Sequence, residues 1–148
     1  MFNMNFLKDA KIVRVANGAT AAQTTVTTSV VDTQGFNSVC FVAALGDVSD
    51  GSVLALTVKT NSANATTGDD VAAASTTAGL TADATSADNK MLAVDLNKPR
   101  QRYAFATLAR GTANAVVDGV FAILYNAQEH PVTQDSSLVD SASLNDAA

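Results

Sequence analysis

Three closely spaced cations, Lys98, Arg100 and Arg102, are the residues of this chain whose type and spacing best suit a specific contact. The chain as a whole is acidic, with nine Lys and Arg against fourteen Asp and Glu and a net charge of -5. A basic spot on an acidic body orients a partner through local charge complementarity. Charges on a solvated strand edge, which prevent unwanted strand pairing, would explain the same pattern. The segment therefore predicts either a docking site or a protected edge.

Residues capable of catalysis are scarce. His130 is the only histidine, so a Ser-His-Asp or Cys-His arrangement would depend on this one residue. Cys40 is the only cysteine and lies in an apolar run, where we expect a buried, inert thiol. A zinc site needs several His or Cys ligands. These counts predict that the protein is not an enzyme and has no cofactor.

Carboxylates are plentiful, but their spacing indicates no specific site. Clustered loop oxygens can bind a hard cation such as calcium, yet no spacing here resembles an EF-hand loop, and Asp in loops usually caps turns. A pair of glycosidase carboxylates is disfavoured because aromatic residues, which usually hold a sugar, are few. We therefore expect no metal. Six Asp residues fall in predicted loops: Asp47, Asp50, Asp69, Asp70, Asp83 and Asp88.

The composition also argues against two classes of partner. Negative net charge disfavours nucleic acid, because phosphate neutralisation supplies most of that affinity, and it disfavours an anionic membrane surface. No stretch approaches the length of a membrane span. The first six residues lack the basic start and apolar run of a signal peptide. We expect no nucleic-acid partner, no membrane partner and synthesis in a cytoplasm.

Alternating residue patterns predict the elements that must position these side chains. Leu54, Leu56 and Val58 alternate with small or polar residues, which is typical of a half-buried antiparallel strand. Residues 116–125 are apolar on both faces, so we expect a central strand covered on each side. Turn-forming residues over 46–51 indicate a hairpin. The predicted strands are residues 11–16, 24–31, 37–44, 52–60, 90–96, 102–109 and 116–125.

Seven short strands with few helical patterns predict an all-β fold, an antiparallel β-sandwich of jelly-roll type. The sandwich domain is expected to span residues 11–131, within a chain of 148 residues. Residues 61–88 contain few large apolar side chains and should form a long surface loop. Residues 1–10, with Phe2, Met4 and Phe6 alternating with Asn, suggest an extended N-terminal arm. Residues 132–148 form a polar C-terminal tail that would order only against another surface.

Three stretches carry a family resemblance. They read VDTQGF leading into VCFVAALGD over residues 31–47, DNKMLAVD leading into PRQRY over 88–103, and RGTANAVVDG over 110–119. Together they resemble a family of small tailed-bacteriophage head decoration, or cement, proteins. The resemblance covers roughly residues 24–132, and its motifs are structural rather than catalytic.

The resemblance implies a structural virion protein, a β-sandwich subunit on the outer face of a capsid. Its partners would be the major capsid protein and itself, as a homotrimer, and it would clamp neighbouring capsomers. It would be made in the cytoplasm of a bacterial host. The apolar residues of the N-terminal arm have no expected place in the core, and the cations stand out on an acidic chain. We therefore expect the partner contacts to involve the following side chains: Phe2, Met4, Phe6, Lys98, Arg100, Arg102 and Arg110.

Two other classes of function compete with this one. A carbohydrate-binding or host-surface-binding sandwich, resembling an adhesin, is compatible with the predicted fold. Few aromatic residues argue against it, because sugar platforms usually stack on Trp or Tyr. A hydrolase would have only His130 and scattered Asp residues to work with.

Overall fold

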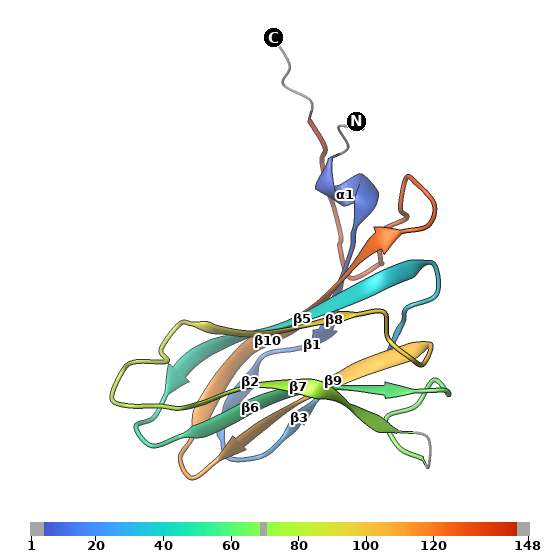
Figure 1. The fold of residues 1–148 in the computed structure, drawn as a ribbon. Coiled ribbons are helices and arrows are strands. Elements are labelled where there is room, and N and C mark those ends of the chain that lie inside the picture. The colour runs from blue at the N-terminus through green and yellow to red at the C-terminus, as the bar shows by residue number, and fades with distance from the viewer. Residues whose placement is uncertain (1–4, 69–70, 145–148) are drawn as a thin grey trace.

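The computed structural model describes residues 5–68 and 71–144, without the side chains of residues 73–76. Two five-stranded antiparallel sheets face each other across a shared core (Figure 1). Sheet A has the order β1 (Lys11–Ala16), β10 (Ala115–Ala127), β5 (Phe36–Val48), β8 (Met91–Asn97), with β2 (Ala19–Ala22) also pairing with β10. Sheet B has the order β3 (Val26–Thr27), β9 (Tyr103–Gly111), β6 (Val53–Asn61), β7 (Ala72–Thr81), with β4 (Val31–Asp32) also pairing with β9.

The strand pairs are nested along the chain. Strand β1 pairs with β10, β3 and β4 pair with β9, β5 pairs with β8, and β6 pairs with β7. The chain thus folds back on itself like one long hairpin, which then rolls into two sheets, the topology of a jelly roll. The predicted all-β antiparallel sandwich is confirmed. Because β1 and β10 are the outermost pair, both ends of the chain leave from sheet A.

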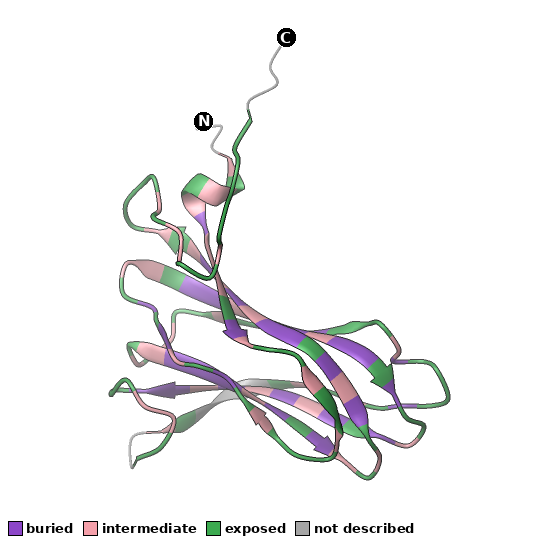
Figure 2. Cartoon of the chain, turned by 180° about the vertical axis from the view of Figure 1, so that it is seen from behind, coloured by how far each residue is buried: buried purple, intermediate pink, exposed green. Residues whose placement is uncertain are grey.

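Alternation along each strand decides which side chains enter the core. Leu54, Leu56 and Val58 of β6 are at most 1% exposed, as their period of two predicts. Figure 2 shows the buried residues following the strands, while the connections and the two chain ends are largely exposed. The largest fully buried side chains come from both sheets, so one core serves the whole sandwich. Sheet A contributes Val39, Phe41, Leu45, Val120 and Leu124, and sheet B contributes Leu54, Leu56, Val58 and Leu108.

The predicted hairpin over residues 46–51 is wrong. Its two flanking strands, β5 and β6, lie in different sheets, so the turn carries the chain from one layer to the other. Gly51, at φ +81°, adopts a backbone conformation that glycine tolerates best, as a sharp reversal requires. Turn chemistry specifies such a reversal but does not decide whether the flanking strands then pair with each other.

Two further expectations need correction. Residues 61–88, predicted as a surface loop, contain the ten-residue strand β7, which pairs with β6. Its Ala- and Thr-rich sequence gave no hydrophobic alternation, and pairing with a strongly patterned neighbour formed the strand. In the predicted extended arm, residues Phe6–Asp9 form one helical turn, α1, and Phe2 and Met4 lie outside the described residues. In the described part of the chain, no helix is long and apolar enough to cross a membrane.

Arg110, expected as a partner contact, is instead a buried structural residue with 5% exposure. Its Nε donates to the Thr24 carbonyl (2.8 Å) and its Nη2 to the Thr24 hydroxyl (3.1 Å). Its Nη1 donates to the carbonyls of Thr20 (2.8 Å) and Ala115 (2.7 Å). The guanidinium therefore ties β2, through Thr20, and the segment between β2 and β3, through Thr24, to the ends of β9 and β10.

We expect Arg110→Met to lower the free energy of unfolding by about 3 kcal/mol or more, because the buried carbonyl of Ala115 and the partly buried carbonyls of Thr20 and Thr24 lose their donor. Arg110→Lys should lie between Met and wild type, since an ammonium group donates to oxygens but lacks the guanidinium fork. Urea denaturation measures both effects. Arg100→Met, at an exposed position, is the control and should stay within about 0.5 kcal/mol of wild type. Equal denaturation midpoints for Arg110→Met and wild type would contradict this structural role.

Candidate interaction surfaces

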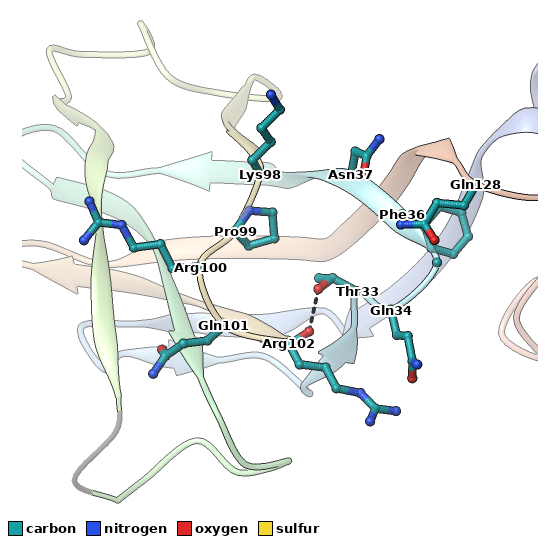
Figure 3. Close-up of a pocket in the computed structure, with 11 residues that line it drawn as sticks. Thr33, Gln34, Phe36, Asn37, Lys98, Pro99, Arg100, Gln101, Arg102 and Gln128 are labelled. Atoms are coloured by element: carbon teal, nitrogen blue, oxygen red, sulfur yellow. Dashed lines mark hydrogen bonds between the residues drawn. The ribbon is translucent and has the colours of Figure 1, made fainter.

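The cationic turn, residues 98–102, connects β8 of sheet A to β9 of sheet B. At its start, the Lys98 amide donates to the Asn37 carbonyl (2.8 Å), and Lys98 adopts a positive φ of 54°. At its end, the Arg102 carbonyl accepts bonds from the amide (2.9 Å) and the hydroxyl of Thr33 (Figure 3). Both ends of the turn are therefore fixed to the segment around the start of β5. A turn held in this way presents its side chains from a rigid base.

Arg102 is already engaged within the chain. Its Nε and Nη2 donate to the two carboxylate oxygens of Asp32 at 2.9 and 2.7 Å, and its guanidinium lies 5.1 Å from the centre of the Tyr103 ring. The hydrogen bonds from Arg102 lower the pKa of the Asp32 carboxyl, and the same pairing raises the pKa of Arg102. This ion pair neutralises one of the three positive charges of residues 98–102. Asp32 lies 70 positions away in the chain, so this pairing could not be predicted from local sequence.

Lys98 and Arg100 are exposed and form no ion pair with any described residue. Figure 3 shows their side chains pointing in different directions, with Arg102 in a third. They border an open depression of about 450 Å³ that Gln34 and Phe36 also line. Because the cations diverge, they do not form a cradle for one small anion. They suit a broad acidic surface that approaches the turn.

The outward side of sheet A is largely apolar. Residues that alternate with the core positions of its four main strands point away from sheet B, and most of them are half-buried or exposed. Met91, for example, is 69% exposed. We call this surface the apolar face: Ile12, Cys40, Val42, Ala44, Met91, Ala93, Phe121, Ile123 and Tyr125. The expectation that residues 116–125 form a central strand is confirmed, but only the inward side of β10 packs against sheet B.

The outward side of sheet B differs sharply. One row across four neighbouring strands consists of threonine: Thr27, Thr107, Thr57 and Thr77 occupy matching register positions. The hydroxyls of Thr57 and Thr77 lie 3.1 Å apart and share a hydrogen bond. Threonine suits a pleated strand that faces water, since its hydroxyl hydrogen-bonds and its β-branch favours extended backbone. The outward side of sheet B therefore carries a polar threonine row that sheet A lacks, although Phe105, on the same side of β9, is 1% exposed.

Two polar groups modify the apolar face. The Tyr125 hydroxyl lies 2.6 and 2.7 Å from the two carboxylate oxygens of Asp95, which raises the pKa of Tyr125. Cys40, expected to be buried, is half-exposed on this face. Partial burial, with a smaller contribution from Asp95, raises the pKa of the Cys40 thiol. A raised pKa keeps the thiol protonated and less nucleophilic.

The two ends of the chain hold each other at the edge of sheet A. The Ile12 amide donates to the Gln134 side-chain oxygen (3.0 Å), and the Arg14 amide donates to the Ser137 hydroxyl (2.9 Å). The Gln134 side-chain nitrogen donates to the carbonyls of Leu7 (2.7 Å) and Ala10 (2.6 Å). These side chains satisfy backbone groups of the edge strand β1 that another strand would otherwise pair with. The surface against which the tail orders includes its own N-terminal segment.

His130 and the carboxylates do not assemble a recognisable reaction centre in the described residues. His130 Nε2 lies 3.5 Å from the Asp9 carboxylate, and both side chains are exposed. Across residues 5–68 and 71–144, no group of three or more His, Cys, Asp and Glu side chains could hold a metal ion. The four cations predicted to contact a partner have different surroundings. Lys98 and Arg100 form no ion pair with the described residues, Arg102 is paired with Asp32, and Arg110 is buried. Phe6, on α1, is 54% exposed.

No family model and no curated protein matches the chain. Among solved structures, it is similar to a chain of the Bacillus endospore appendages, disulfide-linked pili, at 15% identity and a TM-score of 0.43 over 82% of this chain and 91% of that one. A chain of infectious bursal disease virus, Gx strain, has 13% identity and a TM-score of 0.49, covering 82% of this chain and 34% of the viral one. Eiger TNF from S. frugiperda has 9% identity and a TM-score of 0.42, covering 86% and 99%. These likenesses are too distant to indicate what the protein does, and the resemblance to phage decoration proteins stays a prediction.

We expect Asp32→Asn to be less stable than wild type at pH 5–7, and the difference to shrink as the pH falls below about 4. The lowered pKa of Asp32 means that its stabilising contribution is present above its unfolded-state pKa and is lost as pH falls through the folded one. The Asn side chain can still accept the bond from the Gln34 amide (3.0 Å), so the change removes the charge and the bond from Arg102 Nη2 while it keeps this local turn. Thermal unfolding across this pH range measures the difference.

The control for this series is Asp47→Asn, since Asp47 has no arginine partner among the described residues. Its difference from wild type should stay small throughout the range. A stability difference for Asp32→Asn that is independent of pH would show that the ion pair with Arg102 contributes nothing.

We expect Gln134→Ala to raise the hydrogen-exchange rate of the Ile12 amide by about fivefold, because one hydrogen bond contributes about 1 kcal/mol. Exchange followed by NMR gives the rate residue by residue. The amide of Phe41, on the central strand β5, should be unaffected. Unchanged exchange at Ile12 would mean that Gln134 does not protect the sheet edge.

Proposed function

We propose that this chain is a structural virion subunit, a decoration protein that binds the outer face of a tailed-phage capsid and stabilises its capsomers. The observation that carries the proposal is the cationic turn: Lys98 and Arg100 project, unpaired within the described chain, from a base fixed at both ends, on a body of net charge -5. The complement of such a feature is an acidic protein surface. The turn also lies in one of the three stretches that resemble the decoration family.

Mechanical clamping needs a rigid subunit and a repeated footprint. Three features supply rigidity: the shared core, the buried Arg110 network and the edge contacts of Gln134. Repetition supplies strength, because several weak footprints on one assembly raise overall binding by roughly a hundredfold or more without new contacts. On the capsid, the homotrimer that the resemblance implies at three-fold positions would provide such repetition. The proposal assigns no catalytic step and no cofactor to the protein.

A binding module for carbohydrate or a host surface is the competing proposal. The open depression beside the cationic turn favours it, since several side-chain and backbone polar groups surround it. Phe36 is the one aromatic residue among those that line it, whereas sugar platforms usually present several stacked rings. A glycan array would separate the two proposals, because binding of a defined sugar that Phe36→Ala abolishes would favour the module.

We expect the Lys98→Glu, Arg100→Glu double variant to lose at least tenfold in binding to capsids, because like charges at a docking surface repel. Quantitative mass spectrometry of purified particles gives the copy number of wild type and variant. Lys59→Glu, a single charge reversal on the outward side of sheet B, is the control and should retain wild-type occupancy. Full occupancy of the double variant would contradict a docking role for the turn, and absence of the wild-type protein from particles would contradict the proposed function itself.

A further inference from the structure

The apolar face is arranged in ordered rows. Strand register aligns Arg14, Phe121, Val42 and Ala93 in one row across β1, β10, β5 and β8. The neighbouring row consists of Ile12, Ile123, Cys40 and Asp95. In each row, apolar side chains occupy the two central strands. The charged residues occur only at the outer strands.

The two charges lie at opposite edges of the apolar face and in adjacent rows. Arg14, on β1, is exposed, and its guanidinium lies 5.9 Å from the centre of the Phe121 ring. Asp95, on β8, is exposed and accepts hydrogen bonds from Tyr125. Both charges are therefore held over the face by an aromatic side chain rather than directed away from it. Their positions are diagonal to each other across the apolar centre.

We propose that two copies of this chain associate through their apolar faces about a two-fold axis, with Arg14 of each copy against Asp95 of the other. A two-fold axis lying in the plane of a face, perpendicular to the diagonal that joins two points, exchanges those points between the copies. The same operation places the apolar centre of one face on that of the other. The surface is thus self-complementary, as an isologous interface requires.

The charge distribution favours a second copy over other occupants. Each copy carries a net charge of -5, so two copies repel at most orientations. The apolar face carries three charged residues, Arg14 and Asp95 at its edges and Asp118 at one end, so its net charge is far smaller than that of the whole chain and two copies can approach there. An anionic membrane would be repelled by the net charge. The cationic turn, by contrast, presents no acid within its span and remains free for a different, acidic partner.

The size of the face sets the expected strength. Four strands about 4.8 Å apart, with four outward rows about 6.8 Å apart, give roughly 500 Å² per copy. A standard interface buries about 800 Å² per partner. Association is therefore expected to be reversible and to depend on protein concentration.

A reciprocal charge exchange tests the pairing. Sedimentation equilibrium of the full chain from about 10 µM to about 1 mM should show wild type passing from one to two chains. Arg14→Asp alone and Asp95→Arg alone should each raise the dissociation constant at least tenfold, because each creates two like-charged contacts. An equimolar mixture of these two variants should associate to within about threefold of wild type, since every contact in the mixed pair is again of opposite sign.

Matched controls separate this pairing from net charge and from misfolding. Lys59→Asp, on the outward side of sheet B, and Glu129→Arg, in the exposed connection after β10, change the net charge as the two test variants do. Both should self-associate as wild type does. Val42→Thr removes apolar character at the centre of the face with little change in shape and should weaken association at every salt concentration. Thermal unfolding confirms that each variant is folded.

Several results would overturn the proposal: wild type that stays a single chain to 1 mM, a limiting mass of three chains, or a mixture that associates no better than its components. None of these measurements involves a capsid. A failure here therefore leaves the decoration proposal standing, and loss of capsid binding by the turn variant leaves the two-fold pairing standing.

Discussion

The antiparallel pairing of β1 with β10 is the constraint on which the rest of the structure depends. It is the outermost of the nested pairs, so its register positions the start and the end of the chain together at one edge of sheet A. It places β10 between β1 and β5, where its inward residues enter the core and its outward residues form the centre of the apolar face. The residues that follow β10 then lie within reach of β1, which allows Gln134 and Ser137 to cover its free edge.

Most strands could be predicted from the sequence because their apolar residues alternate with a period of two. Leu54, Leu56 and Val58 were placed correctly on the core side. What could not be predicted was the choice of neighbours, since alternation describes one strand at a time and pairing is a long-range property. The turn after β5 could join either strands of one sheet or strands of two. Strand β7 was missed because Ala and Thr residues carry little hydrophobic contrast.

The candidate sites divide in the same way. Exposure of Lys98 and Arg100 follows from local sequence, because long charged side chains are rarely buried unpaired. The roles of Arg102 and Arg110 depend on residues far away in the chain, Asp32 in one case and Thr20 and Thr24 in the other. The apolar face did leave a signal, in the double-sided hydrophobicity of residues 120–125. That signal predicts a strand covered on each side, whereas only the inward side of β10 packs against sheet B.

The side-chain covering of β1 has a consequence for how copies of this protein can meet. An uncovered edge strand adds further strands through its backbone, and such addition has no natural end, as in fibrils. Here the side chains of Gln134 and Ser137 accept hydrogen bonds from the Ile12 and Arg14 amides, and they do not add another strand to the sheet. Residues 134–137 of the same chain therefore block the addition of another strand at the β1 edge of sheet A. This edge therefore does not support open-ended association of copies by strand addition.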